Sequence, residues 1–164
     1  MAANHMIITE QVYARFMAIL ESLDREANAK LVFLVDKSGQ PIATVGELEG
    51  VDSTSLASLT AGNVAATEGV AQLVGEEGFT NLFHEGRKDS MHITVVADHV
   101  ILAVLFDERS SLGLVRLRVE QRVEALGAVV TEMLTSTETA APPVEAEPIG
   151  QITDADIDAL FGGN

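Results

Sequence analysis

Residues 30–45 read KLVFLVDKSGQPIATV, and this stretch decides the fold. Residues 30–36 form a continuous apolar run that is too short for a helix and rich in strand-forming side chains, so they predict a central strand covered on both faces. Residues 37–40 supply a turn. Pro41 then opens a second apolar segment, because proline suits the first position of a strand or an edge strand. The two segments predict an antiparallel hairpin.

Helices are predicted both before and after this hairpin. Over residues 9–27, apolar side chains recur at steps of three and four, which predicts an amphipathic helix. Residues 52–75 begin with a cluster of capping residues and contain no proline, which predicts a second long helix. Apolar positions with the same spacing over residues 112–135 predict a third helix, capped by Ser110 and Ser111.

Three further strands are predicted between the second and third helices, over residues 80–85, 91–97 and 99–106. The last of them is the most apolar and is therefore expected near the centre of the sheet. Strands joined by short turns pair antiparallel, and the helices must cover the two faces. The sequence thus predicts an α+β domain over residues 9–136 in the order α-β-β-α-β-β-β-α, after a disordered N-terminus at residues 1–8.

The composition changes after the third helix. Residues 137–151 read TETAAPPVEAEPIGQ, which is typical of an extended flexible linker. Residues 152–161 read ITDADIDALF, and their N-capping pattern and hydrophobic staple predict a short helix. Ile157, Leu160 and Phe161 share one face of that helix, and we expect this face to bind a partner. The alternatives are a tail that frays and a tail that docks on its own domain.

The charge balance excludes several classes of partner. The chain has 164 residues, with 25 acidic and 10 basic side chains, a formal net charge of −15 and no cysteine. Binding of nucleic acid or of an anionic membrane surface normally requires clustered Lys and Arg, so neither is expected. No apolar run approaches the roughly 20 residues needed to cross a bilayer, and no signal peptide is visible. We therefore expect a cytoplasmic protein without membrane insertion.

The sequence gives little indication of a set of catalytic residues. It contains no phosphate-binding G-x-x-x-x-G-K-[ST] loop, and no general acid and base pair can be named. A metal site built from His84, Glu85, His92 and His99 is the alternative, but their spacing matches no zinc pattern. We therefore expect no catalytic residue, no metal and no cofactor. A binding module is favoured over an enzyme.

The second helix is unusually rich in small residues. Ala61, Ala65 and Gly69 stand at four-residue steps, and such a stripe lets another backbone approach closely. Glycine costs up to about 1 kcal/mol relative to alanine inside a helix, so Gly62 and Gly69 indicate a reason in packing or function. The alternative is that the small residues pack only against the protein's own sheet.

Several segments resemble the Roadblock/LC7 family of proteins. They are residues 29–40, 55–66, 83–86 and 111–117. The specific match is LASLTAGNVAA within residues 55–66, because the apolar strands alone would not identify the family. The resemblance extends closely over residues 29–126, and the terminal pattern I-[ST]-D-x-D-I-D-x-L-F is similar to that of bacterial polarity proteins of this family.

The resemblance implies a specific architecture. The second helix covers one face of a five-stranded antiparallel sheet, and the first and third helices cover the other. Two copies form a homodimer by pairing the strands at residues 80–85, which places the two second helices side by side. The implied dimer interface comprises Thr80, Asn81, Leu82, Phe83 and His84.

The resemblance also implies a function. The paired helices receive a small Ras-like GTPase of bacterial cell polarity and motility and accelerate its GTP hydrolysis, so the protein is a regulator located in the cytoplasm or at a cell pole. The implied GTPase-binding residues are Ala57, Thr60, Ala61, Val64, Ala65, Glu68 and Gly69. The alternative is a Roadblock scaffold that binds a GTPase or a motility component without stimulating hydrolysis.

The implied mechanism needs no inserted arginine. Arg87, Arg109 and Arg116 are the residues that would be nominated for an arginine finger, which is worth about 10³ to 10⁵ in rate. The family instead implies that the dimer stabilises a conformation in which the GTPase's own arginine and glutamine reach the γ-phosphate. The terminal helix would contact the GTPase away from the nucleotide and modulate activation or exchange.

Overall fold

The computed structural model describes residues 8–46 and 49–140. The elements, in chain order, are α1 (Glu10–Ala27), β1 (Leu31–Asp36), β2 (Pro41–Gly46), α2 (Ser53–Val74), β3 (Asn81–Glu85), β4 (Ser90–Val96), β5 (Val100–Phe106) and α3 (Leu112–Ala140). This confirms the predicted order of helices and strands. The predicted helix at residues 152–161, with Ile157, Leu160 and Phe161, lies outside the described residues.

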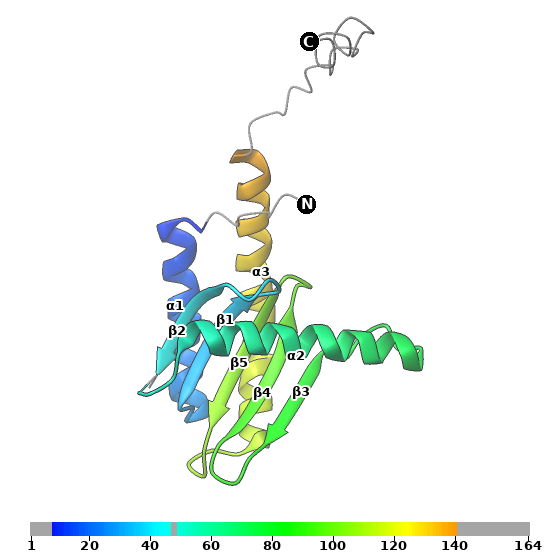
Figure 1. Cartoon of the computed structure of the whole chain (residues 1–164). Helices are drawn as coiled ribbons and strands as arrows, with labels where there is room; N and C mark the ends of the chain where they lie inside the picture. The colour runs from blue at the N-terminus through cyan, green and yellow to red at the C-terminus, as the bar shows by residue number, and fades with distance from the viewer. Residues whose placement is uncertain (1–7, 47–48, 141–164) are drawn as a thin grey trace, which may run out of the picture.

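The strands form one antiparallel sheet in the order β2-β1-β5-β4-β3 (Figure 1). The most apolar strand, β5, occupies the centre, as its composition predicts, and β1 is buried from Leu31 to Val35. The two edges are β2, which begins with Pro41, and β3. Because β1 pairs with β5, the three later strands lie beside the hairpin of β1 and β2.

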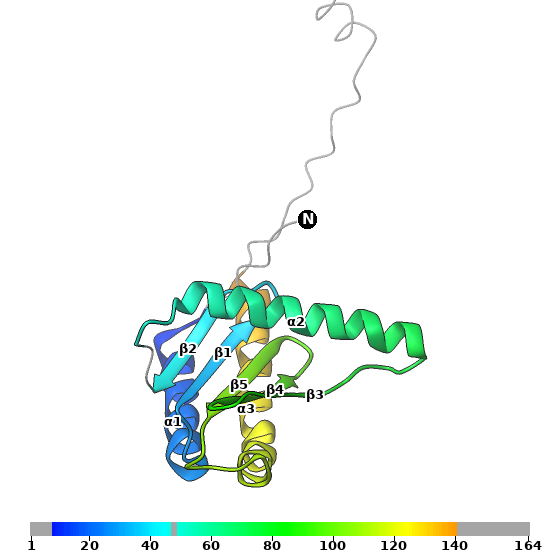
Figure 2. The same ribbon diagram turned by 60° about the horizontal axis from the view of Figure 1, so that its bottom comes forward.

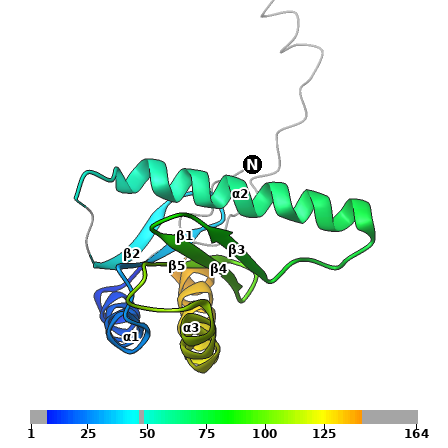
Figure 3. The same ribbon diagram turned by 90° about the horizontal axis from the view of Figure 1, so that it is seen from below.

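Three layers result from this order. Figure 3 shows α2 lying across one face of the sheet, while α1 and α3 run side by side beneath the other. The alternation of side chains along β1 explains how one strand serves both layers. Val32 and Leu34 pack toward α1 and α3, whereas Leu31, Phe33 and Val35 pack toward α2.

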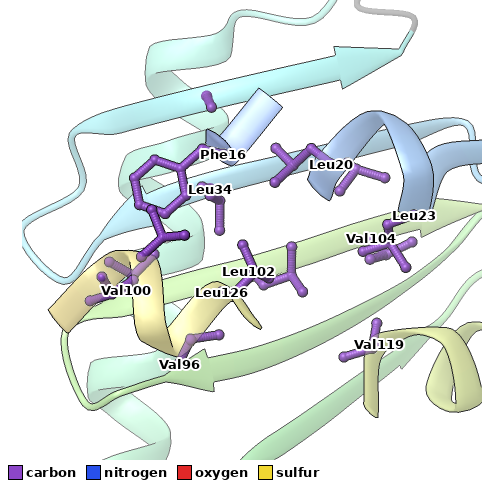
Figure 4. Packing of buried hydrophobic residues seen from close by; sticks show 14 of the residues in the cluster. Phe16, Leu20, Leu23, Leu34, Val96, Val100, Leu102, Val104, Val119 and Leu126 are labelled. Carbon is purple, nitrogen blue, oxygen red and sulfur yellow. The ribbon is translucent and has the colours of Figure 1, made fainter. Parts of the chain in front are cut away.

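The larger core lies between the sheet and the α1–α3 layer. Phe16, Leu20 and Leu23 of α1 interdigitate there with Leu102 of β5 and Leu126 of α3 (Figure 4). All five side chains are fully buried. Fully burying a large aliphatic or aromatic side chain contributes roughly 1.5–3 kcal/mol, so this layer supplies most of the hydrophobic stabilisation.

The core under α2 has a different composition on its helical side. The sheet contributes large side chains such as Phe33, Ile93 and Ile101, but α2 contributes Ala57, Ala61 and Val64. Small side chains on the inner face let the helix axis approach the sheet closely. The interpretation that small residues of this helix pack against their own sheet therefore holds for part of the set.

Local hydrogen bonds fix the helix ends. Thr9 accepts from the Val12 N–H at 3.3 Å at the start of α1, and Ser111 accepts from the Leu114 N–H at 3.2 Å at the start of α3. At the end of α2, Gly75 takes a φ of 78°, which is readily available to glycine. The prediction that Ser110 also caps α3 is wrong, because its hydroxyl donates to the Ala27 carbonyl instead.

The third helix is longer than predicted. It continues to Ala140, whereas the domain was expected to end at residue 136 and the linker to start at residue 137. The hydroxyls of Thr135 and Thr137 donate back to the carbonyls of Thr131 and Met133, both at 2.9 Å, so these polar side chains are satisfied within the helix. Residues 137–140 therefore have the Thr-rich composition of a linker but belong to the helix.

Candidate partner-binding surface

Four of the predicted GTPase-binding residues face inward. Ala57, Thr60, Ala61 and Val64 are all less than 9% exposed and lie on the side of α2 that contacts the sheet. Their role in this chain is to hold the helix against its own sheet. Their predicted contact with a GTPase stays a prediction, although in the single chain they lie against the sheet.

The other three predicted residues remain accessible. Ala65 and Gly69 are exposed, and Glu68 is half-buried and accepts from the Lys37 Nζ at 2.7 Å. Residues four apart on an α-helix differ by about 40° in direction, so the stripe that begins inward at Ala61 has turned outward by Gly69. Spacing alone did not reveal this rotation.

The helical glycines are not required by the packing of a single chain. A Cβ atom built on Gly62 or Gly69 would meet no other described atom within 4 Å. Both positions therefore face open space, although glycine weakens a helix interior. Nothing among the described residues uses their small size, so both leave room for a segment that approaches from outside this part of the chain.

An apolar stripe runs along the outer side of α2, opposite the sheet. We call it the outer stripe, and it consists of Leu59, Gly62, Ala66, Val70 and Leu73. Leu59 is 73% exposed and Leu73 is 88% exposed, which is unusual for leucines in a structured helix. The sequence signal for it was the seven-residue spacing of Leu59, Ala66 and Leu73, which sequence reasoning did not assign to a face.

The C-terminal turns of α2 extend beyond the edge of the sheet. In Figures 1 and 2 the helix passes over β3 and continues past it, so this end has no strand beneath it. Val70, Leu73, Val74 and Phe79, in and just after these turns, are large apolar side chains that remain 40% or more exposed. We call these four residues the α2 overhang.

Beside the overhang, β3 forms an open sheet edge. Within the described residues, Asn81–Glu85 pairs only with β4, so the backbone groups on its outer side have no strand partner. Four of its five residues are exposed, and neither a proline nor a lysine protects it. The predicted interface residues Leu82, Phe83 and His84 all lie on this edge strand; Asn81 begins it and Thr80 precedes it.

The histidines do not converge. Phe83 pairs with His92 and His84 pairs with Met91, so His84 and His92 project from opposite faces of the sheet. His99 lies in the turn between β4 and β5. Within residues 8–46 and 49–140, no group of three His, Asp or Glu side chains is arranged to hold a metal ion.

The three nominated arginines are scattered. Arg109 donates to the Asp107 carboxylate at 2.9 Å, and this hydrogen bond holds the pKa of Asp107 below its usual range. Arg116 lies on α3, across the sheet from α2, and Arg87 lies in the turn between β3 and β4. The outer side of α2 carries no arginine.

None of the described helices combines the length and the apolar composition that a membrane crossing demands.

Comparison with known proteins gives concordant matches. The family model of the Roadblock/LC7 domain matches residues 16–106. The solved structure of MglB from Myxococcus xanthus is 49% identical, with a TM-score of 0.73 over 77% of this chain and 96% of that one. The gliding protein MglB from Thermus thermophilus is 31% identical, with a TM-score of 0.72 over 78% of this chain and 97% of that one. A structure described as MglB with a tetrameric arrangement is also 31% identical, with a TM-score of 0.72, and covers 79% and 97% of the two chains. No curated protein sequence matches the chain.

Proposed function

The chain belongs to the Roadblock/LC7 family, and from this we propose that it is a homodimeric regulator that binds a small Ras-like GTPase and accelerates its GTP hydrolysis. The observation that carries the proposal is the likeness to MglB, which reaches 49% identity over 77% of this chain. The outer side of α2 supports it, since it carries exposed apolar side chains and glycines that no contact among the described residues requires.

Two features of one chain support the homodimer. The open edge of β3 leaves backbone donors and acceptors that a second β3 would pair, and the α2 overhang leaves apolar side chains with nothing beneath them. A second copy that extends the sheet at β3 brings its own strands and its own α2 helix up to the overhang. One contact therefore satisfies both the polar edge and the apolar helix end, which is the self-complementarity that a two-fold interface requires.

The GTPase would bind across the outer sides of the two α2 helices. Leu59 and Val70 of the outer stripe supply apolar anchors. Gly62, Ala65 and Gly69 allow the partner's backbone to come close, because each presents at most a methyl group. Glu68 is held in place by Lys37 and adds a fixed carboxylate beside this surface.

Stimulation without an inserted arginine is consistent with the distribution of cations. Arg116 lies across the sheet from the proposed binding surface, and Arg109 is engaged by Asp107. The dimer accelerates hydrolysis by binding the hydrolysis-competent conformation of the GTPase more tightly than the others, which shifts its population. The protein is then a regulator, and the catalytic groups belong to the GTPase.

The decisive experiment is single-turnover GTP hydrolysis by a bacterial Ras-like GTPase over a titration of this protein. We expect acceleration that saturates at two chains per GTPase. The double variant Ala65→Arg, Gly69→Arg should abolish both binding and acceleration, because two long cations would fill the close-approach surface while the exposed positions leave the fold intact. The matched control is Gly113→Arg, an exposed helical glycine of α3 with open space around it.

Each outcome separates the candidate functions. Normal binding by the Ala65→Arg, Gly69→Arg variant would place the partner on another face. Binding of the GTPase without any rise in turnover would replace the activator by a scaffold that holds a GTPase or a motility component.

We propose that the terminal segment, which lies outside the described residues, strengthens the complex with the GTPase. Truncation after Gly150 removes Ile157, Leu160 and Phe161. We expect the dimer to persist and the affinity for the GTPase to fall, because the apolar face predicted from the sequence for this segment is lost. Affinity by calorimetry and turnover by the single-turnover assay would both be measured, and unchanged values for both would refute this role.

A further inference from the structure

A cavity unrelated to the α2 surface lies on the other side of the sheet. It has a volume of about 300 Å³ and is bounded by the start of β3, by β4 and by α3. Its polar lining includes Asn81, His92, Thr94, Arg116 and Glu120, and Val119 and Val123 line it from α3. Of these residues, only Asn81 belongs to the proposed dimer interface, and none lies on the α2 surface.

A chain of hydrogen bonds fixes the protonation of the buried histidine. The Asn81 amide nitrogen donates to the Thr80 hydroxyl at 3.2 Å, so its oxygen faces Thr94, whose hydroxyl donates to it at 2.8 Å. That donation uses the single hydroxyl proton of Thr94. The Thr94 hydroxyl oxygen must therefore accept from His92 Nε2–H, at 3.0 Å. His92, 3% exposed, therefore keeps Nδ1 as the nitrogen that can take up a proton.

Arg116 is a cation without an ion pair. Among the described residues, no carboxylate lies within 4.0 Å of its guanidinium, whereas Arg118 and Arg122 on the same helix both pair with Glu26. Arg116 is exposed, so its guanidinium is available to an anion that enters the cavity beside the buried imidazole. Burial first, and then Arg116, lower the pKa of His92, while Glu120 opposes them.

We propose that this cavity binds a small organic carboxylate, held by the Arg116 guanidinium and the His92 ring, with a short aliphatic group against Val119 and Val123. A guanidinium matches a carboxylate in shape and charge. The volume is at the lower end of the range for small-molecule sites, so the ligand is small. Glu120 on the same wall disfavours a phosphate, which would bring a second negative charge.

Binding should be coupled to proton uptake. The charged groups that face His92 are Arg116 and Glu120, both from α3, while its cross-strand neighbours Phe83 and Val104 are uncharged. A bound carboxylate offsets the repulsion from Arg116 and raises the pKa of His92. The affinity should therefore rise as the pH falls through the pKa of the bound state.

The test is a titration of the full-length protein, without GTPase, with acetate, isobutyrate and isovalerate, while the ring resonances of His92 are followed by NMR. At least one carboxylate should move these resonances and raise the pKa of His92, whereas isobutyramide, the uncharged counterpart of isobutyrate, should not. Arg116→Gln should weaken binding about tenfold or more, since a charge-assisted hydrogen bond is lost. Arg87→Gln, an exposed arginine outside the cavity, is the matched control.

The outcomes are distinct from those of the GTPase assay. No response of His92 to any of the three acids would overturn the site. Equal responses to isobutyrate and isobutyramide, or unchanged affinity in Arg116→Gln, would also overturn it, and none of these results bears on the α2 surface.

Discussion

Asp24 lies in surroundings that disfavour its charged form. Its Oδ1 is buried near the end of α1 and has no hydrogen-bond partner among the described residues. Burial raises the pKa of Asp24, and the nearby cations Arg25 and Arg109 offset this only in part. The environment is the reverse of that of Asp52, whose pKa is lowered by hydrogen bonds from Ser55 at the start of α2.

We predict that Asp24→Asn stabilises the protein at neutral pH. The folded state of the natural protein binds a proton at Asp24 more tightly than the unfolded state, so its stability falls as the pH rises from about 3.9 through the folded pKa. The Asp24→Asn variant does not lose stability in this way, because its side chain does not ionise. Thermal melting of both proteins over a pH series should show a gain at neutral pH that vanishes in acid.

Asp52→Asn serves as the control of opposite sign. The stabilisation from the ionised Asp52 is present above its unfolded pKa and is lost as the pH falls through the folded pKa. Its replacement should therefore give no gain at neutral pH. A loss of stability in Asp24→Asn at neutral pH would contradict our account of that residue.

At the scale of elements, helix and strand types could be predicted because their signals are local. The apolar run before Asp36, the capping residues Thr9 and Asp52, and the C-terminal Gly75 each act within one or two turns of chain. The orientation of α2 could not be predicted, because small residues cover most of its circumference. Large sheet residues such as Phe33 decide which side faces inward, and they are distant in sequence.

The two sides of α2 should respond differently to the same substitution. Ala61→Arg should destabilise the fold by about 3 kcal/mol, because it forces a long charged side chain into the core under α2. Ala65→Arg, one helical turn later and exposed, should change the free energy of unfolding by about 0.5 kcal/mol or less. Urea denaturation of both variants measures this, and equal losses would mean that α2 is oriented differently.

At the scale of the whole molecule, the sheet formed by the described residues has an edge at β3 that lacks a strand partner. The overhang, the edge of β3 and the outer stripe form a continuous region around one end of the sheet, while the opposite edge begins with Pro41, which lacks a backbone donor. The sequence pattern predicted the strand at residues 80–85, and the family resemblance implied that it pairs with a second copy. It did not reveal the overhang, because that feature depends on where α2 crosses the sheet.

We predict that Val74→Asp, at an exposed overhang position that is not part of the outer stripe, converts the proposed dimer to a folded monomer. The substitution places a charge on the overhang, where the second copy would bury it, and leaves the core of one chain untouched. Sedimentation analysis should give the mass of one chain, with an unchanged circular dichroism spectrum. Leu117→Asp, an equally simple change of an exposed leucine on α3, should remain dimeric, and a dimer in both variants would exclude the overhang from the interface.

The unequal packing on the two faces of the sheet also has a kinetic consequence. Large interlocked side chains attach α1 and α3, whereas α2 rests on Ala57, Ala61 and Val64 and then extends past the last strand. Local opening is least costly where few apolar contacts are broken, so amide hydrogens near the C-terminal end of α2 should exchange long before those of β1 and β5. The protein therefore has a stiff half and a compliant half, and the compliant half is the one that we propose meets its partner.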